Sequence, residues 1–286
     1  MNPRVSVVIV AFNGLSYLPK LKEALDAQLS EKDEVLILDN NSTDGTADWI
    51  ESNWSDTQLV LSDRNLLFVG GNNLLTRKAR GEVVLYLNQD TVPAAGVVEE
   101  AARSAGPKTA VTFAQIFPWS GVPLIPWLDW SGAMLWRRPS DPFEPTSALS
   151  GGAFALHQDM LQQLGGVPFD VRMRHYAEDI NLSLRIHELG MEIRAVSSVS
   201  VTHDSRPSTE NVADDFRRAV QISRERLLAF AYAHGWSNTV RRLPMLLLAG
   251  FRKASVDGRW TLPRALGLTV ATAVGYVWAL FPRTSS

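Results

Sequence analysis

Cysteine is absent from this chain, which excludes a disulfide framework and thiolate chemistry. Histidine is scarce, with five residues, and no spacing of histidines and carboxylates is typical of a zinc site. Internal repeats and low-complexity tracts are lacking as well. The first apolar stretch begins within a few residues of Met1, so we expect no signal peptide and a main domain in the cytoplasm.

Charge is unevenly distributed along the chain. The net charge is −2, yet residues 217–286 carry 11 basic and 2 acidic side chains, a net +9, whereas residues 1–216 carry −11. The basic region is also rich in Leu, Trp and Phe, which favours a membrane over nucleic acid as its anionic partner. Residues 265–282 are uncharged but fall short of the about 20 residues that span a bilayer. We expect helices lying peripherally on the cytoplasmic face of the membrane; alternatively, this region packs on the main domain.

Three apolar stretches end in polar clusters. Residues 5–10 precede Ala11-Phe12-Asn13-Gly14, residues 35–38 precede Asp39-Asn40-Asn41-Ser42, and residues 83–87 precede Asn88-Gln89-Asp90. Helical patterns at residues 16–28, 46–52 and 73–79 alternate with these strands, which predicts a doubly wound, mostly parallel α/β sheet. The carboxyl ends of such strands meet at one edge, where open α/β sheets bind ligands.

The second half of the chain is less regular. Residues 65–73 form an expected loop whose two glycines allow close approach of backbone or ligand. Residues 117–147, with six prolines and four tryptophans, predict a structured loop or hairpin. A strand at 149–156 is interrupted by Gly151-Gly152, helices are expected at 158–164, 178–189 and 214–234, and a last strand at 192–201.

Several side chains at these positions are suited to chemistry. Asp90, at a strand end, is a candidate ligand for Mg²⁺ or Mn²⁺, which prefer oxygen ligands and substrate phosphates; a turn-capping role is the alternative. Asp39 could accept hydrogen bonds from a nucleobase or ribose, whereas Asp44 lies in ideal turn sequence and is interpreted as structural. Glu178 and Asp179 are either helix-capping acids or a general base. His203, at the end of the last strand, is a candidate metal or phosphate contact.

These motifs, taken in order, resemble the family-2 glycosyltransferases of the GT-A fold, and most of all their bacterial rhamnosyltransferase-like branch. The matching segments are Val-Ser-Val-Val-Ile-Val-Ala-Phe-Asn13, Leu-Asp39-Asn-Asn-Ser-Thr-Asp44-Gly-Thr, Leu-Asn88-Gln-Asp90-Thr, Ser150-Gly-Gly-Ala-Phe and Glu178-Asp179-Ile-Asn-Leu-Ser-Leu-Arg185. The resemblance covers about residues 4–230.

The resemblance implies a role for each candidate residue. Asp179 would be the catalytic base, assisted by Glu178, and Asp90 and His203 would contact a Mg²⁺ or Mn²⁺ ion or the diphosphate. The nucleotide and donor-sugar pocket would be lined by Ala11, Phe12, Asn13, Asp39, Asn41, Asn65, Gly71, Asn72, Asn88 and Gln89. The acceptor would lie against Gly151, Gly152 and Trp130.

The sequence also departs from the family pattern. Asn88 replaces the first acid of the Asp-x-Asp motif, which lowers the negative charge at the metal, and Gln89 stands at its middle position. The Gln-x-x-Arg-Trp motif of processive enzymes is absent, which favours the addition of a single sugar.

The expected organisation is a GT-A domain at 1–213, with a nucleotide-binding half at 1–105 and an acceptor-binding half at 106–213, followed by a helical, basic, membrane-associating extension at 214–286. The expected activity is inverting, metal-assisted transfer of one sugar in cell-surface polysaccharide synthesis. The donor would be a deoxythymidine diphosphate sugar such as dTDP-rhamnose, with a UDP-sugar second. The acceptor would be a saccharide or a lipid-linked saccharide. One alternative is a sugar-nucleotide pyrophosphorylase, although the loop at 11–14 is not the glycine-rich, arginine-containing loop that such an enzyme would need. The other is a non-catalytic nucleotide-sugar binder, of which Asn88 would be the sign.

Overall fold

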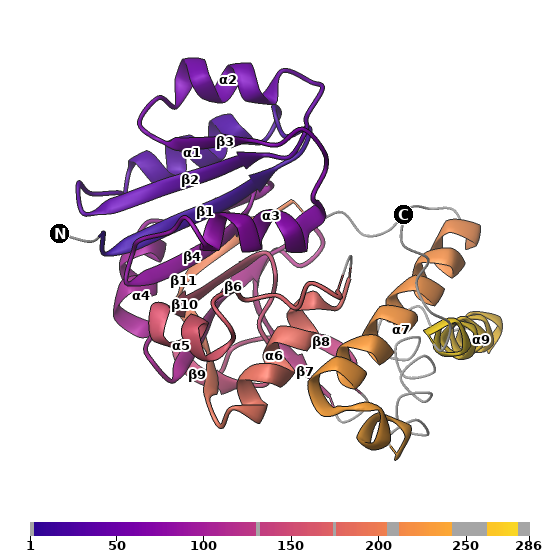
Figure 1. Ribbon diagram of the computed structural model, residues 1–286. Coiled ribbons are helices and arrows are strands. Elements are labelled where there is room, and N and C mark those ends of the chain that lie inside the picture. Colours follow the sequence, from indigo (N-terminus) through magenta and orange to yellow (C-terminus); the bar gives the residue numbers. More distant parts are fainter. Residues whose placement is uncertain (1–2, 130–131, 174–175, 205–211, 242–261, 280–286) are drawn as a thin grey trace.

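The computed structural model describes residues 3–129, 132–173, 176–204, 212–241 and 262–279 (Figure 1). Its first half is a parallel sheet of β3 (Gln58–Leu61), β2 (Asp33–Asp39), β1 (Val5–Ala11) and β4 (Val83–Asn88), in that order. The helices α1 (Leu18–Asp26), α2 (Thr46–Asn53) and α3 (Leu67–Thr76) connect these strands. β1, β2 and β4 are buried almost throughout, as their apolar sequences predict.

The complete sheet is mixed, which corrects the expectation of a mostly parallel one. Beyond β4 the order continues β10 (Ala153–His157), β6 (Thr109–Ile116), β11 (Glu192–His203) and β5 (Thr91–Pro93). β10 is antiparallel to both β4 and β6, and β5 and β9 (Phe143–Thr146) are antiparallel to β11. The strand–helix alternation that imposes parallel pairing ends at β4, and short turns and hairpins in the second half permit strands to run in opposite directions.

The tryptophan-rich segment contains a hairpin, as predicted. β7 (Pro123–Leu128) pairs antiparallel with β8 (Met134–Arg137), and its first residues pair antiparallel with the end of β6. Phe117 stacks on the ring of Trp119 and meets the Trp136 ring edge-on. This aromatic cluster stands directly beside the end of β6.

The predicted loop at 65–73 is wrong over most of its length, because α3 begins at Leu67. Both glycines lie inside this helix. A Cβ atom on Gly71 would approach both Val10 methyl carbons to 2.9 Å and Leu38 Cδ2 to 3.0 Å. Gly71 therefore permits close packing of α3 on the sheet, a tertiary role that the local pattern did not distinguish from a turn.

The remaining helices pack on both faces of the sheet. α4 (Val97–Ser104) lies in the same buried cluster as α1, and α5 (Gln158–Gln163), α6 (Glu178–Glu188) and α7 (Val212–His234) lie in the other. α6 packs on α7, and α7 packs on α9 (Leu262–Ala279) (Figure 1). Leu227, Leu228 and Phe230 of α7 belong to the same buried cluster as Phe154 and Leu182. Within the described ranges, no helix combines the length and apolar character needed to cross a bilayer.

Candidate active site

The polar ends of β1, β2 and β4 lie side by side. Ala11 is in register with Asp39, and Val10 is in register with Asn88. The Asn40 N–H donates to the Ala11 carbonyl at 2.8 Å, which holds the ends of β1 and β2 together. The edge that the strand sequences predicted is thus present.

Asp39 has an unsatisfied oxygen at this edge. The residue is 5% exposed, and its Oδ2 accepts a hydrogen bond from the Ser42 N–H at 3.1 Å. Its Oδ1 is buried and has no hydrogen-bond partner among the described residues. A buried carboxylate oxygen without a partner costs free energy unless a ligand N–H or O–H occupies it.

Asn13 and Asn41 shape the loops around Asp39. Both have left-handed backbones, with φ of 47° and 68°, a conformation that asparagine tolerates better than most residues. Asn13 Oδ1 accepts from the Thr43 N–H, and the Asn13 N–H donates to Ser42 Oγ, both at 2.9 Å. Asp44 accepts from the Leu15 and Thr46 N–H groups, so its predicted structural role is confirmed.

Gln89 ties β4 to the loop after β1. Its Oε1 accepts from the Phe12 N–H at 2.8 Å, and its Nε2 donates to the Phe12 carbonyl at 3.0 Å. The Gln89 amide is therefore engaged with the protein backbone. Phe12 itself leaves 42% of its surface exposed at the edge, where an aromatic face is free to meet a ligand.

Three residues expected in the sugar pocket are occupied by packing or backbone contacts. Asn65 Oδ1 accepts from Asn40 Nδ2 at 3.0 Å and from the Leu67 N–H at 2.8 Å. Asn72 is 2% exposed, and its Nδ2 donates to the Phe68 carbonyl within α3. Gly71 packs on the sheet. The structure therefore places Asn65 at the start of α3, and Gly71 and Asn72 inside that helix rather than on the open edge.

Asp90 and His203 come together although 113 positions separate them. His203 Nε2 lies 3.3 Å from Asp90 Oδ1, and the Asp204 N–H donates to the Asp90 carbonyl at 2.9 Å. His203 is 8% exposed, whereas Asp90 is half-buried. This carboxylate–imidazole pair is a donor set that Mg²⁺ or, better, Mn²⁺ accepts.

Gln115 orients His203, and sequence reasoning missed it. Gln115 Nε2 donates to Ser150 Oγ at 2.8 Å, so its Oε1 is the acceptor for His203 Nδ1, also at 2.8 Å. A protonated Nδ1 leaves the lone pair of a neutral imidazole on Nε2, the nitrogen that faces Asp90. The available signal was an amide side chain, here 0% exposed, near the end of a mainly apolar strand.

The residues present therefore fit a divalent cation at Asp90 and His203. Among the described residues, no three or more acidic or histidine side chains are grouped so that they could hold a metal by themselves. The other ligands of such an ion would come from the diphosphate of a bound nucleotide and from water.

Glu178 and Asp179 begin α6 after a strained backbone. Tyr176 and Ala177 both have left-handed φ, 67° and 59°, which is unusual for two successive residues other than glycine. Asp179 Oδ1 accepts from the Ile180 N–H at 2.8 Å, and its Oδ2 lies 3.4 Å from the Gly151 N–H. Glu178 Oε2 is shielded from solvent and lacks a hydrogen-bond partner among the described residues.

The electrostatics of this pair favour one charge rather than two. Burial, with a smaller contribution from the adjacent Asp179 charge, raises the pKa of Glu178 to about 8. Burial also raises the pKa of Asp179, but hydrogen bonds from the Ile180 and Gly151 N–H groups oppose that shift. Because these donors stabilise a carboxylate on Asp179, we assign the negative charge at neutral pH to Asp179 and the proton to Glu178.

Residues 150–152, called the site turn below, contact both the Glu178–Asp179 pair and the His203–Asp90 pair. Gly151 faces Asp179, whereas a Cβ atom on Gly152 would lie 2.7 Å from His203 Nδ1 and Cε1. Gly151 and Gly152, both predicted at the acceptor position, thus lie between the acid pair and the His203–Asp90 pair. Trp130, the third predicted acceptor residue, lies outside the described residues.

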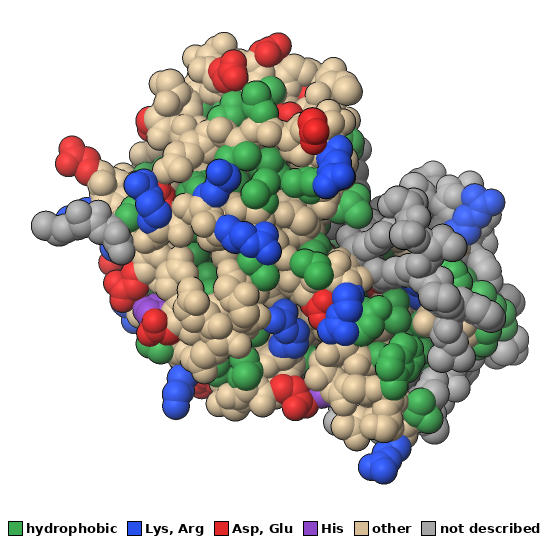
Figure 2. Space-filling view, viewed as in Figure 1, with side chains coloured by type: hydrophobic (Ala, Val, Ile, Leu, Met, Phe, Trp, Pro, Cys, Tyr) green, Lys and Arg blue, Asp and Glu red, His purple; other side chains and the backbone are tan. Residues whose placement is uncertain are grey.

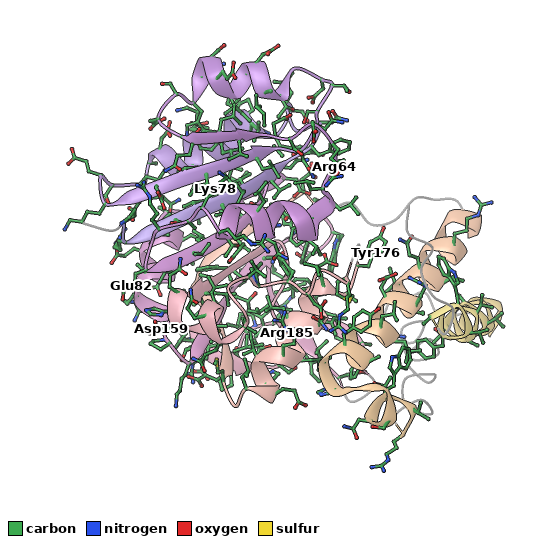
Figure 3. The ribbon with its side chains drawn as sticks, viewed as in Figure 1. Arg64, Lys78, Glu82, Asp159, Tyr176 and Arg185 are labelled. Carbon is green, nitrogen blue, oxygen red and sulfur yellow. The ribbon has the colours of Figure 1, made fainter. Side chains whose placement is uncertain are left out.

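Figure 3 labels three further side chains that bear on this site, Arg64, Tyr176 and Arg185. Arg64, which is exposed, and Tyr176 lie on the side of the molecule where β1 and β2 end. Arg185, the last residue of the matching segment on α6, donates to the Leu164 and Pro168 carbonyls at 2.7 Å. Its position in the motif therefore has a structural explanation, since it holds the loop before α6 against that helix.

Comparisons with solved structures agree with the fold. GalNAc-T7, solved with UDP, GalNAc and Mn²⁺, has a TM-score of 0.64 at 16% identity over 98% of this chain and 56% of its own. The mannosyltransferase PcManGT from Pyrobaculum calidifontis, in complex with GDP-Man and Mn²⁺, has a TM-score of 0.60 at 21% identity over 98% and 89%. S. aureus TarS in complex with UDP-GlcNAc has a TM-score of 0.55 at 16% identity over 96% and 89%. At these identities the likeness establishes the fold alone.

Sequence comparisons supply the family. O-antigen biosynthesis protein RfbC of Myxococcus xanthus is 26% identical over 95% of this chain and 23% of its own length. The uncharacterized glycosyltransferase YfnE of Bacillus subtilis (strain 168) is 32% identical over 33% of this chain and 25% of its own. The matches thus span about a quarter of each of these relatives. The family model for glycosyl transferase family 2 matches residues 6–165, more than half of the chain. The chain belongs to glycosyl transferase family 2.

Proposed function

We propose that this protein transfers a single sugar, with inversion, from a nucleoside diphosphate sugar to a saccharide or lipid-linked saccharide acceptor in cell-surface polysaccharide synthesis. The observation that carries the proposal is the site turn, whose two glycines separate the carboxylate of Asp179 from the His203–Asp90 pair. A base on one side and a diphosphate-binding centre on the other are the two groups that a direct displacement needs. The similarity to an O-antigen biosynthesis protein supports the polysaccharide context.

Each centre would have a distinct task. Asp39 would accept a hydrogen bond from the base or ribose of the nucleotide with its unpaired Oδ1. Asp90 and His203 would hold Mg²⁺ or Mn²⁺, which supplies positive charge to neutralise the leaving diphosphate. Asp179, ionised at neutral pH, would take the proton from the acceptor hydroxyl as that oxygen attacks the anomeric carbon. Protonated Glu178 would orient the acceptor by donating a hydrogen bond rather than competing for its proton.

The donor base is proposed from the acceptor character of Asp39. Thymine and uracil present the same N3–H to a carboxylate, so we propose a dTDP-sugar such as dTDP-rhamnose, and a UDP-sugar second. Two structural neighbours were solved with Mn²⁺ together with UDP or GDP-Man, which supports the proposal of a metal and a nucleotide at this edge. The catalytic unit would comprise residues 1–213, with the nucleotide on 1–105 and the acceptor on 106–213. Residues 214–286 would form a peripheral extension on the cytoplasmic face of the membrane.

Thermal shift with dTDP, UDP and GDP, each with and without Mn²⁺, tests the donor site, and release of nucleotide from matched sugar nucleotides tests chemistry. We expect stabilisation by the pyrimidine diphosphates that increases with Mn²⁺, and slow donor hydrolysis that Asp90→Ala abolishes. Stabilisation by GDP alone would refute the donor assignment. Binding without any hydrolysis or transfer would favour the alternative of a non-catalytic binder, which Asn88 at the first acidic position of the motif keeps open.

A further inference from the structure

Over residues 270–279 of α9, the valines and Trp278 face outward. The buried side of this stretch consists of small or hydroxyl-bearing residues: Ala271, Thr272, Gly275, Tyr276 and Ala279. A Cβ atom on Gly275 would lie 2.3 Å from the Val220 carbonyl oxygen, so the backbones of α9 and α7 are in close contact. The opposite side, called the outward face below, carries Val270, Val274, Val277 and Trp278, each between 45% and 58% exposed.

This arrangement is the reverse of an ordinary surface helix, whose apolar stripe faces the core. The outward residues are spaced at i, i+4, i+7 and i+8, so they form one continuous stripe. With Ala273, three of them line a shallow apolar hollow. Figure 2 shows hydrophobic side chains gathered at the described part of the C-terminal helices. Contiguous exposed apolar surface of this kind marks an interaction site.

The charge of this region indicates which kind of partner covers the outward face of α9. Residues 217–286 carry a net +9, and Arg217 and Arg241 are exposed on the described helices. Two copies pairing symmetrically through the outward face would bring two such basic regions together, which electrostatic repulsion opposes. A surface of anionic lipid satisfies both the apolar stripe and the positive charge. We propose that the outward face of α9 lies on an anionic membrane surface, with Val274, Val277 and Trp278 inserted among the lipids.

The same helices would fix how the active site is held above the membrane. Trp278 is oriented by the Arg224 guanidinium of α7, which lies 4.4 Å from its ring centroid. α7 is in turn joined to the base-carrying helix, since Asn181 Nδ2 donates to the Ala229 carbonyl at 3.0 Å and Glu188 pairs with His234. Membrane contact through α9 therefore positions α6, and with it Asp179, for an acceptor that is anchored in lipid. The contact deepens the peripheral membrane association proposed above, and this last step also rests on the proposed sugar transfer.

Vesicle co-sedimentation of the full chain, without donor or acceptor, tests the contact. The protein should bind vesicles of phosphatidylcholine and phosphatidylglycerol, bind phosphatidylcholine alone much less, and lose binding as salt is added. Val274→Asp with Val277→Asp should weaken partitioning by at least about tenfold, because two apolar side chains leave the lipid contact. Val171→Asp, at a position 72% exposed outside the extension, is the matched control and should bind like the parent.

Several results would overturn this proposal. One is a parent protein that ignores anionic vesicles at low salt; another is a double aspartate variant that binds as tightly as the parent. A dimer measured by light scattering, dissolved by the double variant and indifferent to vesicles, would identify a second copy as the occupant. If the aspartates prevent folding, judged by thermal unfolding, Val274→Ser with Val277→Ser gives the same comparison. Donor hydrolysis measured without vesicles separates a failure here from a failure of the proposed function.

Discussion

Glu178→Gln tests whether the structure keeps this carboxyl group protonated near neutral pH. The substitution preserves shape and removes the ionisation. Burial raises the pKa of Glu178 from 4.5 to about 8 in the folded protein, and its Oε2 has no partner among the described residues to stabilise a charge. Between these two pH values, the folded chain retains a proton that the unfolded chain has lost. Raising the pH through this range therefore favours unfolding of the parent protein.

The size of this loss of stability follows from the difference between the two pKa values of Glu178. A pKa shift of one unit corresponds to about 1.4 kcal/mol. If Glu178 were fully buried and titrated independently, the shift from 4.5 to about 8 would lower the stability of the parent protein by at most about 4 to 5 kcal/mol over this pH range. Glu178 is half-buried and shares its titration with Asp179, which reduces this to roughly 2 kcal/mol. The glutamine variant lacks this loss. Its stability relative to the parent should therefore rise by about 2 kcal/mol between pH 5 and pH 8, then level off.

Urea unfolding of both proteins at pH 5, 6, 7 and 8 measures the difference. An unpaired glutamine amide adds a constant cost of about 1 to 3 kcal/mol; the change with pH is independent of that offset. Glu31→Gln, which removes an exposed carboxyl group before β2, is the matched control for the loss of one acidic side chain. The assignment of the proton to Glu178 would be refuted if the free energies of unfolding of Glu178→Gln and the parent differed by the same amount at every pH. It would also be refuted if the Glu31→Gln control showed an equal change with pH.

Four further predictions concern activity and metal. Asp179→Asn should lower kcat by at least about 10²-fold with donor affinity nearly unchanged, the scale of a lost general base; equal turnover would reassign the base. Asp90→Ala should abolish Mn²⁺-dependent nucleotide binding, measured by calorimetry, while the thermal transition persists. Gly152→Ala should weaken Mn²⁺ binding, because its methyl group would meet His203 Nδ1 at 2.7 Å; unchanged affinity would mean that His203 is no ligand. Gln115→Leu should shift the His203 tautomer towards Nε2–H in ¹⁵N NMR spectra of the metal-free protein.

The first half of the fold was predictable because its signals are local. Apolar strands, capped turns and short connections specify parallel pairing, and parallel pairing brings the ends of β1, β2 and β4 to one edge without further information. Asp39 and Asp90 could be singled out for this reason alone. The same reasoning failed for Gly71. A glycine that allows a helix to pack closely on a sheet cannot be distinguished by local sequence from a glycine that allows a turn.

The contacts that bring His203 beside Asp90 and Gln115 could not be predicted from local sequence patterns. His203 and Gln115 are 88 positions apart, and no periodicity relates them. Their contact depends on β11 lying beside β6, a parallel pairing that follows from neither segment by itself. Gln115 was therefore overlooked, and the antiparallel insertion of β10 between β4 and β6 was not expected.

The sequence by itself determined β1, β2 and β4 with their polar ends, and the acidic pair at the start of α6, since each is encoded in residues close along the chain. It also indicated the family, through five short motifs in order. The strand β6, which carries Gln115, was not predicted. Only the tertiary structure decided which of these act together. It placed the site turn between Asp179 and His203, shielded Glu178 Oε2 so that the pKa of Glu178 rises, and oriented Val274, Val277 and Trp278 of α9 outward. Burial and long-range contact are properties of packing, and they have no counterpart in a linear pattern of residues.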